Sequence, residues 1–176
     1  MPSRSFVRQF IDCLKADISD TNTSGKDTTG SNVTITAHVY QYYGSEGGYD
    51  YGAHKANAEQ HNDSYGILVG ASDTPPNNSD YNLGNPIHDG SESGELEYGE
   101  MTFYDVTEES GYVEFSMRRI FYNGGTEDVT VKEIGLVVYH WYSKKKFLWI
   151  RDVLGTPITV EPAQMLTVQY IMKTKA

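Results

Sequence analysis

The last third of the chain consists of strand-forming segments separated by tight turns. Residues 112–122 and 166–171 are rich in Val, Ile, Phe and Tyr, and Asn123-Gly124-Gly125 supplies a turn that tolerates positive φ. In residues 129–142 the apolar alternation slips by one position near Glu133. Such a slip reverses the two faces of a strand, so it predicts a β-bulge there. Short strands between regular turns predict an all-β fold, an antiparallel β-sandwich of jelly-roll type.

The composition excludes several classes of function. The chain of 176 residues carries 24 acidic and 14 basic side chains, a net charge of −10. Domains that bind nucleic acid present a basic surface, so direct nucleic-acid binding is not expected. No apolar run approaches the ~18 residues of a membrane span, and the single cysteine, Cys13, forms no disulfide within the chain. We expect a product of a reducing cytoplasm that has no contact with membranes.

The N-terminal residues 1–31 are expected to form a helix and a polar linker, ahead of a sandwich domain at 32–176. Within the predicted helix 4–18, Phe6, Phe10 and Leu14 recur at every fourth position and form an apolar stripe. The polar linker 19–31 separates this helix from the first strand. Two interpretations remain open: the helix packs on its own β-domain, or it docks on a neighbouring subunit with these three residues as anchors.

A long segment without periodicity, residues 44–64, follows the first strand. Glycines alternate there with Tyr49 and Tyr51, just after Tyr43. A loop of this length is uncommon in a compact domain and is usually functional. The three tyrosines could recognise a glycan or a protein, could order against a neighbouring subunit, or could form an ordinary surface loop.

Motifs for catalysis or for cofactor binding are missing from the sequence. It contains no nucleophile elbow, no His-Glu-x-x-His helix and no phosphate-binding loop. His54 and His61 share a loop with Glu59 and Asp63, which is a conceivable metal site. Histidines in loops are more often simply solvated, so neither a metal nor a cofactor is expected.

An acidic cluster is the other candidate for chemistry. Asp105, Glu108, Glu109 and Glu114 lie close together in the sequence, and paired carboxylates can hydrolyse glycosides. The cluster coincides with a predicted turn, however, and acidic turns are normal in a chain of this charge. We therefore expect a protein that is not an enzyme.

Two arginines interrupt apolar strands. Arg119 breaks the apolar face of residues 112–122, and Arg151 is followed by Asp152. A buried guanidinium needs a carboxylate or carbonyl partner, and Glu133 or Asp152 could serve. These four residues are expected to form a structural polar network and no ligand site.

Ordered motifs across residues 65–173 resemble a widespread group of virion proteins of tailed bacteriophages. The motifs cover about 60% of the chain and follow the order Gly66-Ile-Leu-Val-Gly70, Thr74-Pro75, Asp80-Tyr81-Asn-Leu83, Pro86-Ile87, Gly90, Arg119-Ile-Phe121-Tyr-Asn123, Val129-Thr-Val-Lys-Glu-Ile-Gly-Leu136, Arg151-Asp152-Val-Leu154, Pro157-Ile-Thr-Val160 and Leu166-Thr-Val-Gln-Tyr-Ile171.

The resemblance implies a non-enzymatic structural subunit of a phage particle, with no catalytic residues to carry over. Such a subunit would form homo-oligomers in the neck, the tail or the capsid, and would dock on portal, tail or major capsid proteins. It would be made in the host cytoplasm and end in the virion. The alternative is a β-sandwich module on the virion surface that binds a glycan or a receptor.

Overall fold

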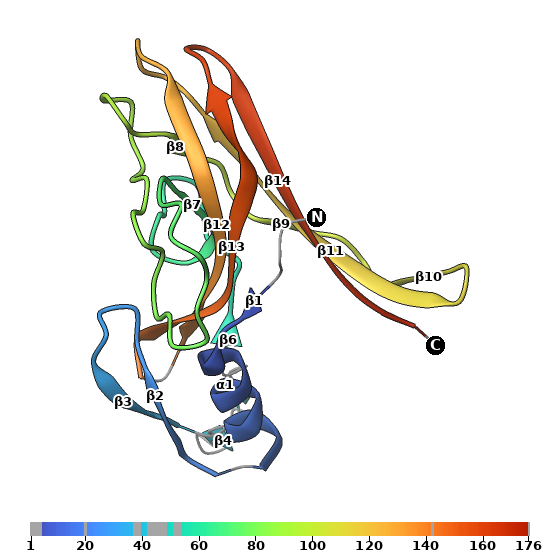
Figure 1. Cartoon of the computed structure of the whole chain (residues 1–176). Coiled ribbons are helices and arrows are strands. Elements are labelled where there is room, and N and C mark those ends of the chain that lie inside the picture. The colour runs from blue at the N-terminus through green and yellow to red at the C-terminus, as the bar shows by residue number, and fades with distance from the viewer. Residues whose placement is uncertain are drawn as a thin grey trace.

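The computed structural model describes residues 5–19, 21–36, 40–41, 49–50, 54–141 and 143–175. Its described part is mostly β-structure, with antiparallel sheets and one short helix near the N-terminus (Figure 1). The predicted all-β, sandwich-like class is therefore confirmed.

The first sheet is built around the long hairpin of β12 and β13. The other edge of β12 pairs with β7 and β6, and β13 also pairs with β1. The described strands of this sheet are β1 (Ser5–Phe6), β6 (His54–Lys55), β7 (Gly66–Gly70), β12 (Val129–His140) and β13 (Lys145–Val160).

The second sheet is built around β11, which pairs with β14 along the whole length of both strands. Three short strands follow one another along the other edge of β11. The described strands of this sheet are β8 (Glu97–Tyr98), β9 (Thr102–Phe103), β10 (Thr107–Glu109), β11 (Tyr112–Tyr122) and β14 (Met165–Lys175).

The main core lies between the inner faces of these two sheets. Leu136, Leu148 and Ile150 of the first sheet belong to one buried cluster with Phe121 and Val168 of the second. Buried apolar area is the main source of stability in such a sandwich. These inward-facing residues, which alternate with outward-facing ones along each strand, therefore determine which faces of the two sheets pack together.

The predicted β-bulge is confirmed, and it is larger than one residue. The pairing of β12 with β13 passes from Val131–Ile158 to Glu133–Val153, so residues 154–157 of β13 lie opposite Lys132 alone. Pro157 falls in this excess, where no ladder hydrogen bond is required of its nitrogen. A second register shift lies between Leu136 and Val137.

The N-terminal helix α1 (Arg8–Ser19) begins later than the predicted residue 4. Ser5 and Phe6 instead form β1, which pairs with Arg151 and Ile150, and the amide of Val7 donates to the carbonyl of Trp149. Backbone pairing with the open edge of β13 replaces the first helical turn, which the apolar periodicity alone could not reveal.

The predicted linker 19–31 also contains a strand. β2 (Thr23–Lys26) pairs with β3 (Asn32–Ile35), and a second small sheet joins β4 (Tyr40–Gln41) to β5 (Tyr49–Asp50). Cys13 and Ala16 of α1 pack with Ile35 of β3, and with Val138 and Phe147 of the first sheet, in a second buried cluster. The helix therefore packs on its own β-domain.

Candidate assembly surface

The helix α1 turns its larger apolar side chains away from the protein. Its buried residues are Gln9, Cys13 and Ala16, which lie on the side that faces the sheet. Ile11, Leu14 and Ile18 lie on the opposite side and are 57%, 39% and 76% exposed. Phe10 lies one turn before Leu14 and is partly buried, and Phe6 lies in β1 and not in the helix, so the expected helical stripe of Phe6, Phe10 and Leu14 is only partly formed.

Phe6 connects this helix face to the first sheet. It lies in β1 and is 46% exposed, and its ring centroid is 4.5 Å from that of Phe10. Phe10 in turn meets Trp149 of β13 edge to face at 5.2 Å. The structure thus brings two of the three expected helix anchors, Phe6 and Phe10, into contact, with Leu14 one turn further along α1.

Beyond Phe6, one end of the second sheet extends away from the rest of the molecule (Figure 1). We call this part the arm: β10 with residues 112–116 of β11 and 171–175 of β14. The inner face of the second sheet continues into the arm, where Val113 and Phe115 lie beside Thr174 and Met172. Because the first sheet does not extend as far, this part of the apolar face has less to pack against.

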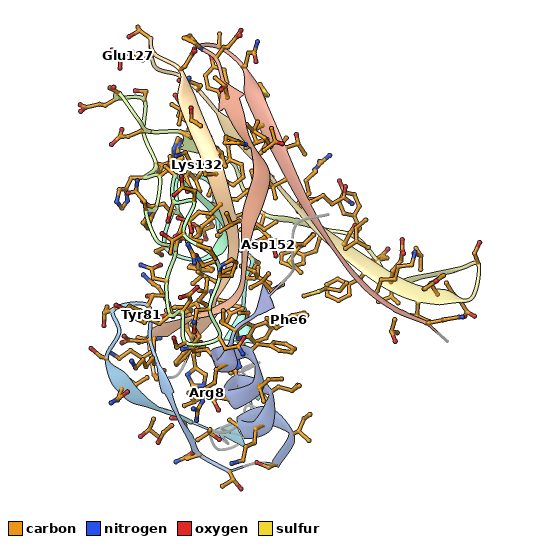
Figure 2. All side chains as sticks on the ribbon, in the orientation of Figure 1. Phe6, Arg8, Tyr81, Glu127, Lys132 and Asp152 are labelled. Atoms are coloured by element: carbon orange, nitrogen blue, oxygen red, sulfur yellow. The ribbon has the colours of Figure 1, made fainter. Side chains whose placement is uncertain are left out.

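An open groove of about 510 Å³ lies between the arm and the edge of the first sheet. Figure 2 shows Phe6 at the junction of α1 with the sheets, and this side chain lines the groove. Its lining is mainly apolar and includes Phe6, Val113, Phe115, Ile150, Tyr170 and Met172. We call the outer face of α1, Phe6 and this groove together the apolar surface.

Sequence reasoning found only part of this surface. The sequence predicts the stripe of Phe6, Phe10 and Leu14, but the apolar alternation of residues 112–122 does not distinguish the exposed Phe115 from the buried Phe121 of the same face.

The predicted loop anchors fall largely outside the described residues. This is true of Tyr43 and Tyr51 entirely, and the structure places only the backbone of Tyr49, in β5. The end of the predicted loop is ordered: β6 pairs with β12, and Ala58 is buried in the main core.

Two members of the predicted polar network form a buried ion pair. The Nε atom of Arg151 donates to Oε2 of Glu133 at 2.8 Å, and its Nη1 donates to Asp80 at 2.7 Å. Glu133 is fully buried and also accepts the amide hydrogens of Ser72, Gly84 and Asn85. The pair thereby holds the loop between β7 and β8 against the first sheet.

The other two members lie elsewhere. Asp152 accepts a hydrogen bond from the hydroxyl of Tyr170 at 3.1 Å, across the two sheets. Within the described residues, Arg119 donates to main-chain carbonyls alone, the shortest contacts being 2.7 Å to Gly99 and 2.7 Å to Asn62. The guanidinium also lies 4.7 Å from the ring centre of Tyr98. Burial lowers the pKa of Arg119 to about 10, which leaves it charged at neutral pH.

Asn123 is a structural residue that the sequence signalled only as a turn. Its buried side-chain amide donates to the carbonyls of Glu127 and Val160, both at 2.8 Å. Asn123 lies in the segment that connects β11 to β12, and Val160 is the last residue of β13, before the segment that leads to β14. The side chain of Asn123 therefore links the two connections that pass between the sheets.

The histidines and acids considered for metal binding form separate pairs. His54 lies 2.9 Å from Asp17 of α1, and His61 lies 3.2 Å from Asp89. Asp63 pairs instead with His88 at 2.9 Å. Among the residues that the structure describes, no three His, Cys, Asp or Glu side chains are arranged to hold a metal ion.

The acidic cluster lies in and beside the arm. Glu114 forms an ion pair with Lys173 at 2.9 Å, and Asp105 and Glu108 are exposed. The side chain of Glu109 is outside the described part. Of the three acids whose side chains the structure describes, two are thus exposed and the third is neutralised by a lysine.

Comparisons with known proteins give no relative for this chain. A scan against protein families, a search of characterised proteins and a search of solved structures each found no match. Within the described residues, no helix is long and apolar enough to cross a membrane.

Proposed function

We propose that this chain is a non-enzymatic structural subunit that assembles with copies of itself and with other proteins through the apolar surface. The observation that supports the proposal is the continuity of that surface. It runs from Ile18, Leu14 and Ile11 of α1 through Phe6 into the groove beneath the arm. Apolar patches of this extent on a folded protein usually mark a contact with another molecule.

The burial pattern of α1 strengthens this proposal. A helix that served only its own domain would turn Ile11, Leu14 and Ile18 toward the core and leave its small and polar residues outside. In α1 the small and polar residues Gln9, Cys13 and Ala16 are inside. The arrangement suits a helix that binds its own domain with one face and a partner with the other.

The setting of this assembly is a tailed-phage particle, at the neck, the tail or the capsid. This part of the proposal depends on the ordered motifs of residues 65–173 and their resemblance to virion proteins. Portal, tail or major capsid proteins are the corresponding partners, and the virion is the location.

A complementation experiment tests the proposed function. Particles of the phage that encodes the chain are produced with an Ile11→Glu/Leu14→Glu double variant as the only source of this protein. Because a charged side chain cannot be buried cheaply in an apolar contact, we expect the variant to fold but to be depleted at least about tenfold from purified particles.

The matched control is Lys15→Glu, which changes the charge of an exposed residue beside the stripe. It should enter particles at the normal level. If the double variant is folded and is incorporated as well as this control, the outer face of α1 is not a docking surface.

A further inference from the structure

We propose that β14 pairs with β14 of a second copy, in antiparallel orientation, so that the second sheets of two molecules join into one. The inference rests on the proposed function, because it names one contact by which the subunit meets itself. It uses the backbone edge of β14, whose residues 170–174 also line the groove of the apolar surface.

The edge of β14 is long and unprotected. In the described part of the chain β14 pairs only with β11, and that pairing runs without a register shift from Tyr122–Met165 to Tyr112–Lys175. The strand contains no proline, and the open edge has neither a bulge nor a covering element in the described residues. Such an edge offers a row of unpaired amide and carbonyl groups to another strand.

Among the described residues, the remaining edges of the two large sheets are protected in ways that natural proteins commonly use. β13 is distorted by the large bulge with Pro157 in its pairing with β12, and its open side is partly covered by β1. The outer edges on the other side of both sheets are made of strands with two to five residues. Compared with these edges, β14 is the edge strand best suited to pair with a strand of another molecule.

Backbone hydrogen bonds show which groups of β14 point outward. The carbonyls of Ser116 and Ile120 in β11 accept from Tyr104 and Gly99, on the side away from β14. In an antiparallel ladder the groups alternate, so the odd-numbered residues of β11 bond to β14. Their partners in β14 are the even-numbered residues, which leaves the amide and carbonyl groups of Thr167, Gln169 and Ile171 directed to the free edge.

The charges of β14 favour an antiparallel partner of the same sequence. Lys173 and Lys175 lie at one end of the strand, and no acidic residue occurs in it. Parallel pairing in register would place these lysines opposite one another. Full antiparallel overlap places them opposite Thr167 and Met165 of the other copy, with Gln169 opposite Ile171, so like charges stay apart.

Sedimentation of the full chain provides the first test. Gln169→Pro removes an outward amide on both copies and should leave the β11–β14 ladder intact, because prolines are tolerated on edge strands. We expect the dimer dissociation constant to rise at least about tenfold. Gln169→Thr is the matched control: it also loses the side-chain bond from Gln169 to Ser116 but keeps the amide, and it should dimerise like the wild type.

Cross-linking provides the second test and does not depend on a proline. Gln169→Cys and Ile171→Cys proteins are mixed under mild oxidation, which should give a disulfide-linked dimer, because directly opposite residues lie about 5.5 Å apart between Cα atoms. The native Cys13 is buried and does not compete. A mixture of Gln169→Cys with Thr130→Cys, exposed on β12, controls for random collision.

Dimers weakened in Gln169→Pro but not in Gln169→Thr, together with the mixed cross-link, support the pairing. If the mixed pair cross-links no faster than the Thr130→Cys control, the pairing is wrong, whatever the sedimentation shows. That result would leave assembly through the apolar surface standing, since incorporation of the α1 variants is measured separately.

Discussion

Arg119 is buried beside Tyr98, and its five N–H groups donate to main-chain carbonyls, with no carboxylate acceptor in the part of the chain that the structure describes. The acceptors come from residues 59, 62, 65, 67 and 99. A planar guanidinium can satisfy such a set, whereas an ammonium group offers only three donors from one point. Arg119 therefore holds the chain before β7 and the end of β8 against β11.

Replacing this side chain should destabilise the protein strongly. Arg119→Lys leaves at least two buried carbonyls without a donor, and we expect a loss of about 3 kcal/mol in the free energy of unfolding, measured by urea denaturation. The control is Arg118→Lys, on the opposite face of β11, which should cost less than about 1 kcal/mol. Equal losses in the two variants would contradict this role.

The sequence predicted that these arginines are structural but not which groups they meet. Glu133 was a predicted partner, and it does bind Arg151, because the two residues lie on paired neighbouring strands. The acceptors of Arg119 are carbonyls in irregular segments far away in the sequence. Every residue has a main-chain carbonyl, so the sequence alone does not show which carbonyls accept from Arg119. These acceptors are known only from the folded structure.

At the scale of the elements, α1 is joined to the β-domain through a buried histidine pair. His54 of β6 is bonded to Asp17 of α1, and its ring centroid is 4.9 Å from that of His140 in β12. Phe147 and Trp149 of β13 lie against the same histidine. Burial lowers the pKa of His54, and burial followed by the charge of His54 lowers the pKa of His140.

These pKa shifts predict an acid-sensitive junction. A histidine whose pKa is lowered by folding binds protons more tightly in the unfolded state than in the folded state. The folded protein therefore keeps its full stability above pH 6.5, the ordinary pKa of histidine, and loses stability as the pH falls below that value. We expect the free energy of unfolding to decrease from pH 7.5 to pH 5.5, and His54→Gln to make that decrease shallower. Chemical denaturation at three pH values within that range measures both.

His88→Gln is the matched control for that experiment, since His88 is an exposed histidine paired with Asp63. It reports the effect of losing a histidine as such. The junction would not be the acid-sensitive element if His54→Gln and His88→Gln gave the same pH dependence as the wild type.

The elements themselves were predictable to different degrees. The long strands β11 to β14 follow from their β-branched and aromatic residues, and the phase slip located the bulge at Glu133. The start of α1 did not follow, because the pairing of Ser5 and Phe6 with β13 competes with the helical pattern. β2 was missed because Thr23 to Lys26 carries almost no apolar signal and is held mainly by pairing with β3.

For the whole molecule, the two packed sheets account for stability, whereas the groove and the outer face of α1 are the apolar areas that we propose to contact partners. Arg119, Asn123 and the Glu133–Arg151 pair fix irregular segments to the sandwich. The arm then carries the inner face of the second sheet beyond the first one. The sequence could predict the sandwich, but the exposed part of its apolar face depends on where one sheet ends, which is a property of the packed fold.

The central claim is that the chain is an assembly subunit that buries its apolar surface against neighbouring molecules. Electron cryomicroscopy of the phage particles in which we propose that the chain assembles tests this most directly. The account predicts density for the chain in a symmetric arrangement, with Leu14 of α1 and Phe115 of the groove buried by adjacent subunits. Its absence from the particles, or a position in which both residues face solvent, would contradict the claim.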